Sequence, residues 1–260
     1  MRSFICTIGY LLISIFNHAQ SLVPTVIASA GGYQTNVGIS LSFTIGETNT
    51  QTLTSANHML TQGFQQPFEL NLLNVKAFLQ GYYAGSGQMQ DVLFNQGEYA
   101  NASLIADSIT VELHNATSPY ALAFQTRSTI KQDGNLSIKG MGIIGQSYYI
   151  VLKHRNHIET WSANPVLLTE NTLYDFSTAA NKAYGDNQVE VELGNFAFYT
   201  GDITQDGVVD GLDYNDWEND SNNFASGYFS TDLNGDGIVD GLDFLFWEQN
   251  SNNFVGAVMP

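Results

Sequence analysis

The chain has 260 residues, of which 25 are acidic and 8 are lysine or arginine, so its formal net charge at pH 7 is −17. A surface this acidic repels phosphate groups, which excludes nucleic acid as an expected partner. The length is enough for a sizeable core and for two or three domains.

The first twenty residues follow the order of an export signal. Arg2 precedes an apolar run from Phe4 to Phe16, and a polar stretch closes the segment. The run is short of the ~20 apolar residues that span a bilayer, so we expect a signal peptide over 1–20 and no transmembrane anchor. The protein is then secreted, extracellular or at the cell surface. Its single cysteine, Cys6, leaves with the signal, so the mature chain has neither a disulfide nor a thiol nucleophile.

Residues 21–69 read as a separate β-rich segment. Runs of β-branched and apolar residues at 25–32, 41–47 and 59–67 predict three or four strands. The last run contains Gly63-Phe64-Gln65-Gln66-Pro67, which resembles the amino-terminal region of secreted proteins from Bacteroidota. That resemblance implies a secreted context and no particular reaction.

Residues 72–199 alternate apolar and polar residues between turn signals, which is typical of a mainly β domain. We expect a β-sandwich, immunoglobulin-like or prealbumin-like. Two runs are expected to pair as a hairpin across the turn 115–119: Ile109, Val111 and Leu113 on one strand, and Tyr120, Leu122 and Phe124 on the other. Tyr148, Ile150 and Leu152 continue the pattern.

Signals of catalysis are weak in this segment. Glu190 and Glu192 alternate with apolar residues, so both should lie on the solvent face of a strand. His154 and His157, in an extended segment, should point to opposite faces and form a polar strand end. Five rings could stack on a sugar, although core packing explains most of them: Tyr82, Tyr83, Tyr148, Tyr149 and Trp161.

The C-terminal segment, 200–260, contains a repeat. Residues 202–213, here called the first loop, return thirty positions later as residues 232–243, the second loop. Calcium takes six to eight oxygens, and a loop of twelve residues can supply them from positions 1, 3, 5, 9 and 12 and from the carbonyl of position 7. The sequence therefore predicts two Ca²⁺ sites, with these ligands: Asp202, Thr204, Asp206, Val208, Asp210 and Asp213 in the first loop, and Asp232, Asn234, Asp236, Ile238, Asp240 and Asp243 in the second.

Two further features support this interpretation. Each loop has glycine at position 6, Gly207 and Gly237, where the chain must turn sharply. Residues 201–260 contain no lysine or arginine and carry twelve acidic residues, a charge that bound cations would reduce. Position 12 is the short Asp in both loops. Position 3 of the first loop is Thr204, a neutral ligand, and we therefore expect the first site to be the weaker one.

The repeat continues into a short helix after each loop, with Trp217-Glu218 matching Trp247-Glu248. Six side chains at three-to-five-residue spacings are expected to form a small core between the halves: Leu212, Tyr214 and Trp217, with Leu242, Phe246 and Trp247.

This duplicated pattern, Asp-x-Asn-x-Asp-Gly-x-Val-Asp-Gly-Leu-Asp, resembles the type I dockerin module, an EF-hand-like calcium repeat, over residues 200–254. The resemblance implies a cohesin-like partner in extracellular polysaccharide-degrading assemblies. The chain departs from the usual pattern at loop positions 10 and 11, where it has Gly211-Leu212 and Gly241-Leu242 in place of small hydroxyl residues.

The sequence thus predicts a secreted, non-catalytic protein with a β-rich body and a tail that calcium orders. The tail is expected to attach the protein to another extracellular protein or surface, and polysaccharide degradation is one context for this role. Two alternatives stay open. One is a glycoside hydrolase component, and the other is a carbohydrate-binding or adhesive module.

Overall fold

The computed structural model has two compact units, residues 1–68 and 69–260. It describes residues 30–36, 39–45, 52–55, 58–61, 72–96, 104–141 and 143–260. The expected signal peptide over 1–20 and the Gly-Phe-x-Gln-Pro stretch lie outside the described residues. The proposed domain boundaries stay a prediction.

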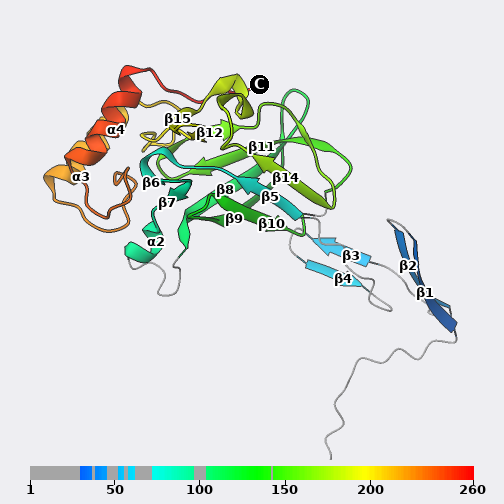
Figure 1. The fold of residues 1–260 in the computed structure, drawn as a ribbon. Coiled ribbons are helices and arrows are strands. Elements are labelled where there is room, and N and C mark those ends of the chain that lie inside the picture. Colours follow the sequence, from blue (N-terminus) through cyan, green and yellow to red (C-terminus); the bar gives the residue numbers. More distant parts are fainter. Residues whose placement is uncertain are drawn as a thin grey trace, which may run out of the picture. The chain divides into compact units, whose positions relative to one another are not determined.

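The first unit contains two antiparallel hairpins (Figure 1). Strand β1 (Ala30–Asn36) pairs with β2 (Ile39–Ile45), and β3 (Thr52–Ser55) pairs with β4 (His58–Thr61). The strands expected around Leu41 and Met59 are therefore present.

The second unit is built on two larger sheets (Figure 1). In the three-stranded sheet, β5 (Leu72–Lys76) lies between antiparallel β10 (Asn135–Lys139) and parallel β14 (Asn171–Asp175). The five-stranded sheet has the order β12 (His157–Trp161), β11 (Ser147–His154), β8 (Ile105–Asn115) and β9 (Leu122–Lys131), with β13 (Val166–Leu167) also paired to β11.

Shorter elements complete this unit. Two small hairpins are β6 (Tyr83–Gly85) with β7 (Gln88–Met89) and β15 (Val189–Glu192) with β16 (Asn195–Ala197). The α-helices are α2 (Val92–Asn95), α3 (Gly211–Asn222) and α4 (Gly241–Asn252), and the 3₁₀ turns are η2 (Gln80–Tyr82), η3 (Ala180–Lys182) and η4 (Tyr184–Asp186). The mainly β class expected from the sequence is confirmed.

The predicted hairpin is strands β8 and β9, paired so that Leu113 faces Phe124. Alternation buries Ile109, Val111 and Leu113 on one face, each at most 1% exposed. Tyr120, expected on the second strand, lies instead in the turn, where its φ is 53° and its N–H donates to the Thr117 carbonyl at 2.9 Å. The strand therefore begins at Leu122.

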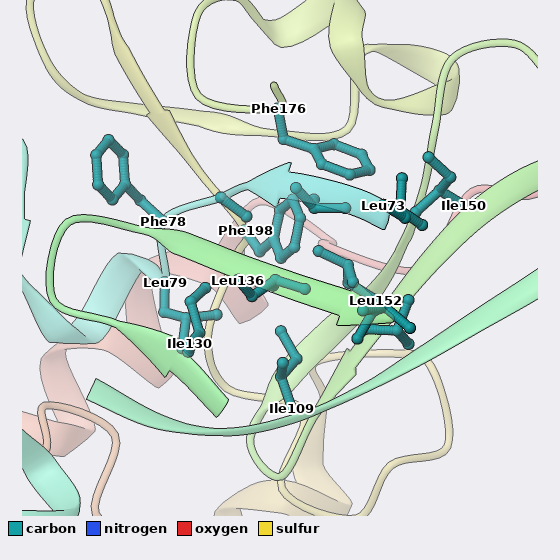
Figure 2. Packing of buried hydrophobic residues seen from close by; sticks show 14 of the residues in the cluster. Leu73, Phe78, Leu79, Ile109, Ile130, Leu136, Ile150, Leu152, Phe176 and Phe198 are labelled. Atoms are coloured by element: carbon teal, nitrogen blue, oxygen red, sulfur yellow. The ribbon is translucent and has the colours of Figure 1, made fainter. Parts of the chain in front are cut away.

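The inner faces of the two larger sheets share one hydrophobic core (Figure 2). Leu73 of β5 and Leu136 of β10 lie in the same buried cluster as Ile109, Ile150 and Leu152 of the five-stranded sheet. Burying one such side chain stabilises the fold by about 1.5–3 kcal/mol. This face-to-face packing is the arrangement of a β-sandwich.

The outer face of β11 is covered as well. Tyr149, Val151 and Trp161 form a second buried cluster, against which Tyr120 and Tyr184 pack. Adjacent tyrosines on a strand point to opposite faces, and Tyr148 and Tyr149 are both buried because both faces of β11 carry a core.

Candidate functional site

The two C-terminal repeats have the same helix starts. Asp210 and Asp240 are the N-caps of α3 and α4, both with φ −143°, and accept from the amides of Leu212 at 2.8 Å and Leu242 at 2.7 Å. Three residues on, Asp213 and Asp243 accept from the cap amides, each at 2.9 Å. These are reciprocal capping boxes, so the carboxylates at positions 9 and 12 hold the loop to its helix.

Asp202 and Asp213 are the buried carboxylates of the first loop, 2% and 0% exposed. Asp202 accepts from the amides of Asp206 at 3.1 Å and Gly207 at 3.2 Å, and Asp213 accepts from Ile203 at 2.8 Å and Thr204 at 2.9 Å. Gly207 has φ 91°, a conformation that glycine adopts without strain.

The second loop repeats this arrangement. Asp232 accepts from Gly235 at 2.8 Å and Gly237 at 3.0 Å, and Asp243 accepts from the amides at positions 2 and 3 at 2.7 and 3.0 Å. Both carboxylates are 0% exposed, and Gly237 has φ 86°. The structure therefore brings together positions 1 and 12 of each predicted ligand set.

The other predicted ligands are arranged differently. Asp206 and Asp236 are exposed and accept from the amides of Val208 at 3.0 Å and Ile238 at 2.9 Å. Thr204 is exposed, whereas Asn234 is buried and donates to Asp236 at 3.1 Å. Within the described ranges, no three His, Cys, Asp or Glu side chains are grouped closely enough to hold a metal ion.

Burial, together with the charge of the other buried carboxylate in the same loop, raises the pKa of Asp202 and of Asp243 to about 7. Burial also raises the pKa of Asp213 and Asp232. Each loop thus holds two buried carboxylates whose repulsion is relieved by a proton or a cation. An all-oxygen set that is acidic and lies beside a sharp glycine turn fits Ca²⁺, a hard cation. Asp202 and Asp213, or Asp232 and Asp243, would hold the ion, and it would supply the charge that the loop lacks.

The two helices are joined by reciprocal bonds. Trp217 Nε1 donates to the Asp240 carbonyl at 3.0 Å, and Trp247 Nε1 donates to the Asp210 carbonyl at 2.8 Å. Each tryptophan ring also packs on a ring of the opposite helix, with centroids 5.1 Å apart for Trp217 and Phe244 and for Trp247 and Tyr214.

The side chains packed between α3 and α4 differ in part from those predicted from the sequence. Leu212 and Leu242 are 56% and 54% exposed, because residues two apart on a helix lie on nearly opposite sides and Tyr214 faces the partner helix. Phe244 takes the place expected for Phe246, since it lies one turn before Trp247 on the same face.

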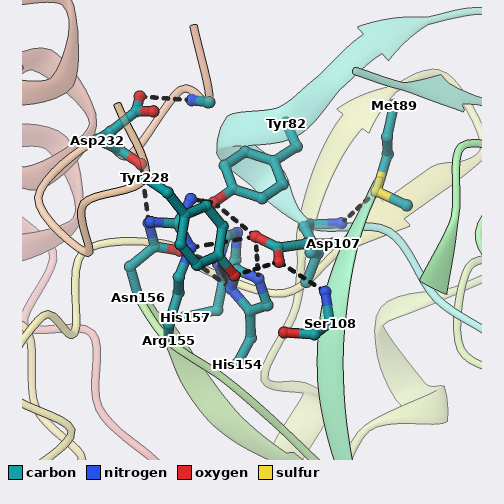
Figure 3. A network of polar contacts seen from close by, with 12 residues as sticks. Tyr82, Met89, Asp107, Ser108, His154, Arg155, Asn156, His157, Tyr228 and Asp232 are labelled. Carbon is teal, nitrogen blue, oxygen red and sulfur yellow. Dashed lines mark hydrogen bonds and ion pairs between the residues drawn. The ribbon is translucent and has the colours of Figure 1, made fainter. Parts of the chain in front are cut away.

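A buried polar network lies beneath the second loop (Figure 3). His154 and His157, expected on opposite faces, have their Nδ1 atoms 2.9 Å apart and are 3% and 0% exposed. The expectation was wrong because β11 and β12 are joined by a tight turn at Arg155 and Asn156 that brings the two rings together. Burial, then the charges of His154 and Arg155, holds the pKa of His157 well below its usual range.

Asp107 is the acid of this network. It lies 3.1 Å from both His154 Nε2 and Arg155 Nε, and Tyr82 and Tyr228 donate to it. Burial alone would raise its pKa, but the bond and charge of His154 and the charge of Arg155 hold that pKa well below the usual range. Sequence reasoning missed Asp107, because nothing in its neighbourhood along the chain marks it as buried.

The network also anchors the second loop to the β-rich body. Asn156 Nδ2 donates to the Asp232 carbonyl at 2.9 Å, and Arg155 donates to the Phe229 carbonyl. The Arg155 guanidinium lies 3.9 Å from the centre of the Tyr228 ring. The first loop instead borders a cleft lined by Lys153 and Glu159.

The remaining candidates in the body are placed as follows. Glu190 and Glu192 are exposed, as expected. Of the five rings considered for a sugar, Tyr83 is partly exposed, and the others are buried: Tyr82, Tyr148, Tyr149 and Trp161. No helix in the described part of the chain is long and apolar enough to cross a membrane.

Comparison with known proteins gives no family. No family model and no curated protein matches the chain. The chain is similar to two solved structures of type II cohesin–X-dockerin complexes from Acetivibrio cellulolyticus. One is a C-terminal interface mutant, with 14% identity, a TM-score of 0.43, and coverage of 72% of this chain and 97% of that chain. The other is an N-terminal interface mutant, with 16% identity, a TM-score of 0.41, and coverage of 70% and 97%.

These findings correct the dockerin-like assignment. No family model matches the chain, and the resemblance rested on residues 200–254 alone. The two loops and helices also belong to the same compact unit as the sheets. The identification of the tail as a dockerin module was therefore wrong.

Proposed function

We propose that this chain is a non-catalytic extracellular protein that attaches to another protein or surface through its two loop–helix repeats, with two Ca²⁺ ions as folding cofactors. The reciprocal bonds from Trp217 to Asp240 and from Trp247 to Asp210 carry the proposal. They tie the start of each helix, next to its buried carboxylates, to the opposite helix. An ion in either loop therefore orders both repeats.

The exposed face of the repeats supports attachment. Leu212, Leu242 and Leu245 are 54–56% exposed on α3 and α4, and Phe224 and Phe254, which follow the helices, are 90% and 91% exposed. The same segment has no basic residue. A partner suited to it has apolar pockets bordered by lysine or arginine, because such a rim complements the acidic surface.

The alternatives have less support. Trp161 is 5% exposed and packs in the second cluster, so it is not available for stacking on a sugar. No arrangement of described residues favours a glycoside hydrolase component or a carbohydrate-binding module over attachment. A role in polysaccharide degradation, with a polysaccharide or a cohesin-like protein as partner, rests on the sequence alone.

Calcium binding is tested by a calorimetric titration of the chain, with far-ultraviolet circular dichroism before and after chelation. We expect two sites and a gain of helix with calcium. Asp232→Ala should abolish the tighter site and Asp202→Ala the weaker one. Asp216→Ala, which removes an exposed charge from α3 outside the loops, is the matched control. Absence of binding heat in the unmodified chain contradicts the calcium proposal. If the site that remains in Asp202→Ala is no tighter than the site that remains in Asp232→Ala, the ranking is wrong.

Attachment is tested by retention of the chain on immobilised extracellular proteins from its own source, with calcium or with chelator. Retention should need calcium and should be lost in the double variant Leu212→Asp and Leu242→Asp. Leu193→Asp is the control, since Leu193 is 94% exposed between β15 and β16 of the body. Retention that survives chelation, or that falls equally in the control, argues against these helices as the contact.

A further inference from the structure

Gln96 reaches from the β-rich body into the second loop. It follows α2, and its backbone amide donates to the Val92 carbonyl at 3.0 Å. Its side-chain Nε2 donates to Asp232 Oδ2 at 2.6 Å and to the Gly235 carbonyl at 3.4 Å. The amide nitrogen thus lies between two oxygens of the loop, one of which belongs to a predicted calcium ligand.

The other end of the same amide is unsatisfied. Gln96 Oε1 is buried and has no hydrogen-bond partner. An unpaired buried acceptor costs about 1–3 kcal/mol. The oxygen and nitrogen of a glutamine amide have nearly the same shape, so a half turn of the group exchanges them without altering the packing. That turn would direct Oε1 at two other oxygens, which is favourable only when a cation lies among them.

We propose that Gln96 Oε1 is a ligand of the second calcium ion, contributed by the body from outside the twelve-residue loop. The inference rests on the proposed function, which it deepens. Amide carbonyls of glutamine are ordinary calcium ligands, and this one adds an oxygen without adding charge. Binding turns the amide, so the bond from Nε2 to Asp232 is replaced by two contacts to the same ion.

The body holds Gln96 in place for this role. A Cβ atom on Gly235 would lie 2.5 Å from Val92 Cγ2 and 2.9 Å from the Tyr82 ring, so α2 is pressed directly against the loop. Val92 and Tyr82 are both 0% exposed. A ligand on an immobile support loses little entropy when the ion binds, which favours tight binding.

The first loop lacks this contribution. Asp202 accepts from the backbone amides of Asp206 and Gly207, and among the described residues no side chain of the body is bonded to its carboxylate oxygens. The second ion therefore joins loop to body, whereas the first is held by its loop alone. This difference adds to the effect of Thr204 and makes the second site the tighter one.

The test is a calorimetric calcium titration of the full chain carrying Gln96→Ala or Gln96→Glu. Loss of the amide should weaken one of two sites by on the order of tenfold, the lower end of what removing a supporting metal contact costs. Gln96→Glu supplies a carboxylate oxygen at the same place and should restore or tighten that site. Asn95→Asp adds the same charge one residue earlier, where the side chain is exposed, and should change neither site by more than about twofold.

The outcomes separate the inference from the proposed function. If the unmodified chain binds two ions and Gln96→Ala binds them equally well, the inference is wrong and the proposed function stands. If Gln96→Glu weakens the site as much as Gln96→Ala does, Gln96 acts only as a donor to Asp232, and the inference is again wrong. If the unmodified chain binds no calcium, the proposed function is wrong, and so is the inference that rests on it.

Discussion

The two loops are nearly identical along the chain and differ in their surroundings. Both end in the same capping box, and both bury the carboxylates at positions 1 and 12. At positions 3 and 4, Asn234 and Gly235 of the second loop are buried, whereas Thr204 and Gln205 of the first loop are exposed. The repeated sequence therefore gives the same local structure twice. The contacts with the rest of the unit differ, and they determine how strongly each loop is stabilised.

The largest expected effect comes from Arg155→Ala, which removes one of the links between the C-terminal repeats and the body, the bond to the Phe229 carbonyl. It leaves the buried Asp107 with His154 but without the arginine, so we expect a loss of up to about 3–5 kcal/mol in the free energy of unfolding. Chemical denaturation measures it. Arg127→Ala is the control, since Arg127 is exposed and donates to Ser108, and it should cost at most about 1 kcal/mol. Similar losses in both variants would show that the buried network does not hold the second loop.

A smaller effect is expected from Gly81→Ala, which tests the close approach of the second loop. A Cβ atom at Gly81 would lie 1.9 Å from the Leu233 carbonyl oxygen, so backbone must shift. Overpacking of this kind costs about 1–3 kcal/mol.

The matched control for Gly81→Ala is Gly211→Ala, at the start of α3, where an added methyl group meets nothing within 4 Å. It should be neutral or stabilising by up to about 1 kcal/mol, because alanine favours helix over glycine. If Gly81→Ala unfolds at the same denaturant concentration as the unmodified chain, the second loop is not seated against η2 as described.

The smallest expected effect is on pH dependence without calcium. The pKa of Asp202 and of Asp243 is about 7 in the folded chain, above the value of about 4 for an unfolded aspartate. The folded state then binds more protons than the unfolded state between these values, so the free energy of unfolding falls as pH rises from about 4 to about 7. Thermal unfolding in chelator should show a higher midpoint at about pH 5 than at about pH 8.

Two variants assign the pH dependence to the loops. Asp202→Asn should remove the contribution of the first loop and Asp243→Asn that of the second, each leaving a shallower slope. Calcium should flatten or reverse the slope, because the ion needs the deprotonated carboxylates. A midpoint that rises with pH in chelator would contradict the raised pKa values.

Several features of this fold could be predicted from the sequence. The hairpin of β8 and β9 and the buried face of Ile109, Val111 and Leu113 follow from alternation over a short segment. The helices after each loop follow from their caps, Asp210 and Asp240. The prediction that Leu212 packs in the core between the two helices was wrong, because residues that share a helix face with Tyr214 lie three or four positions from it, and Leu212 lies two positions away.

What the sequence by itself determined is local: loops, caps and hairpin depend on hydrogen bonds between residues a few positions apart, and their spacing is visible in the chain. Tertiary structure alone decided the parallel pairing of β14 with β5, the joining of His154 and His157 over Asp107, and the bond between Gln96 and Asp232, which are 136 positions apart. Such contacts depend on how distant segments pack around a shared core, and no periodic pattern in the chain specifies which polar side chains then meet.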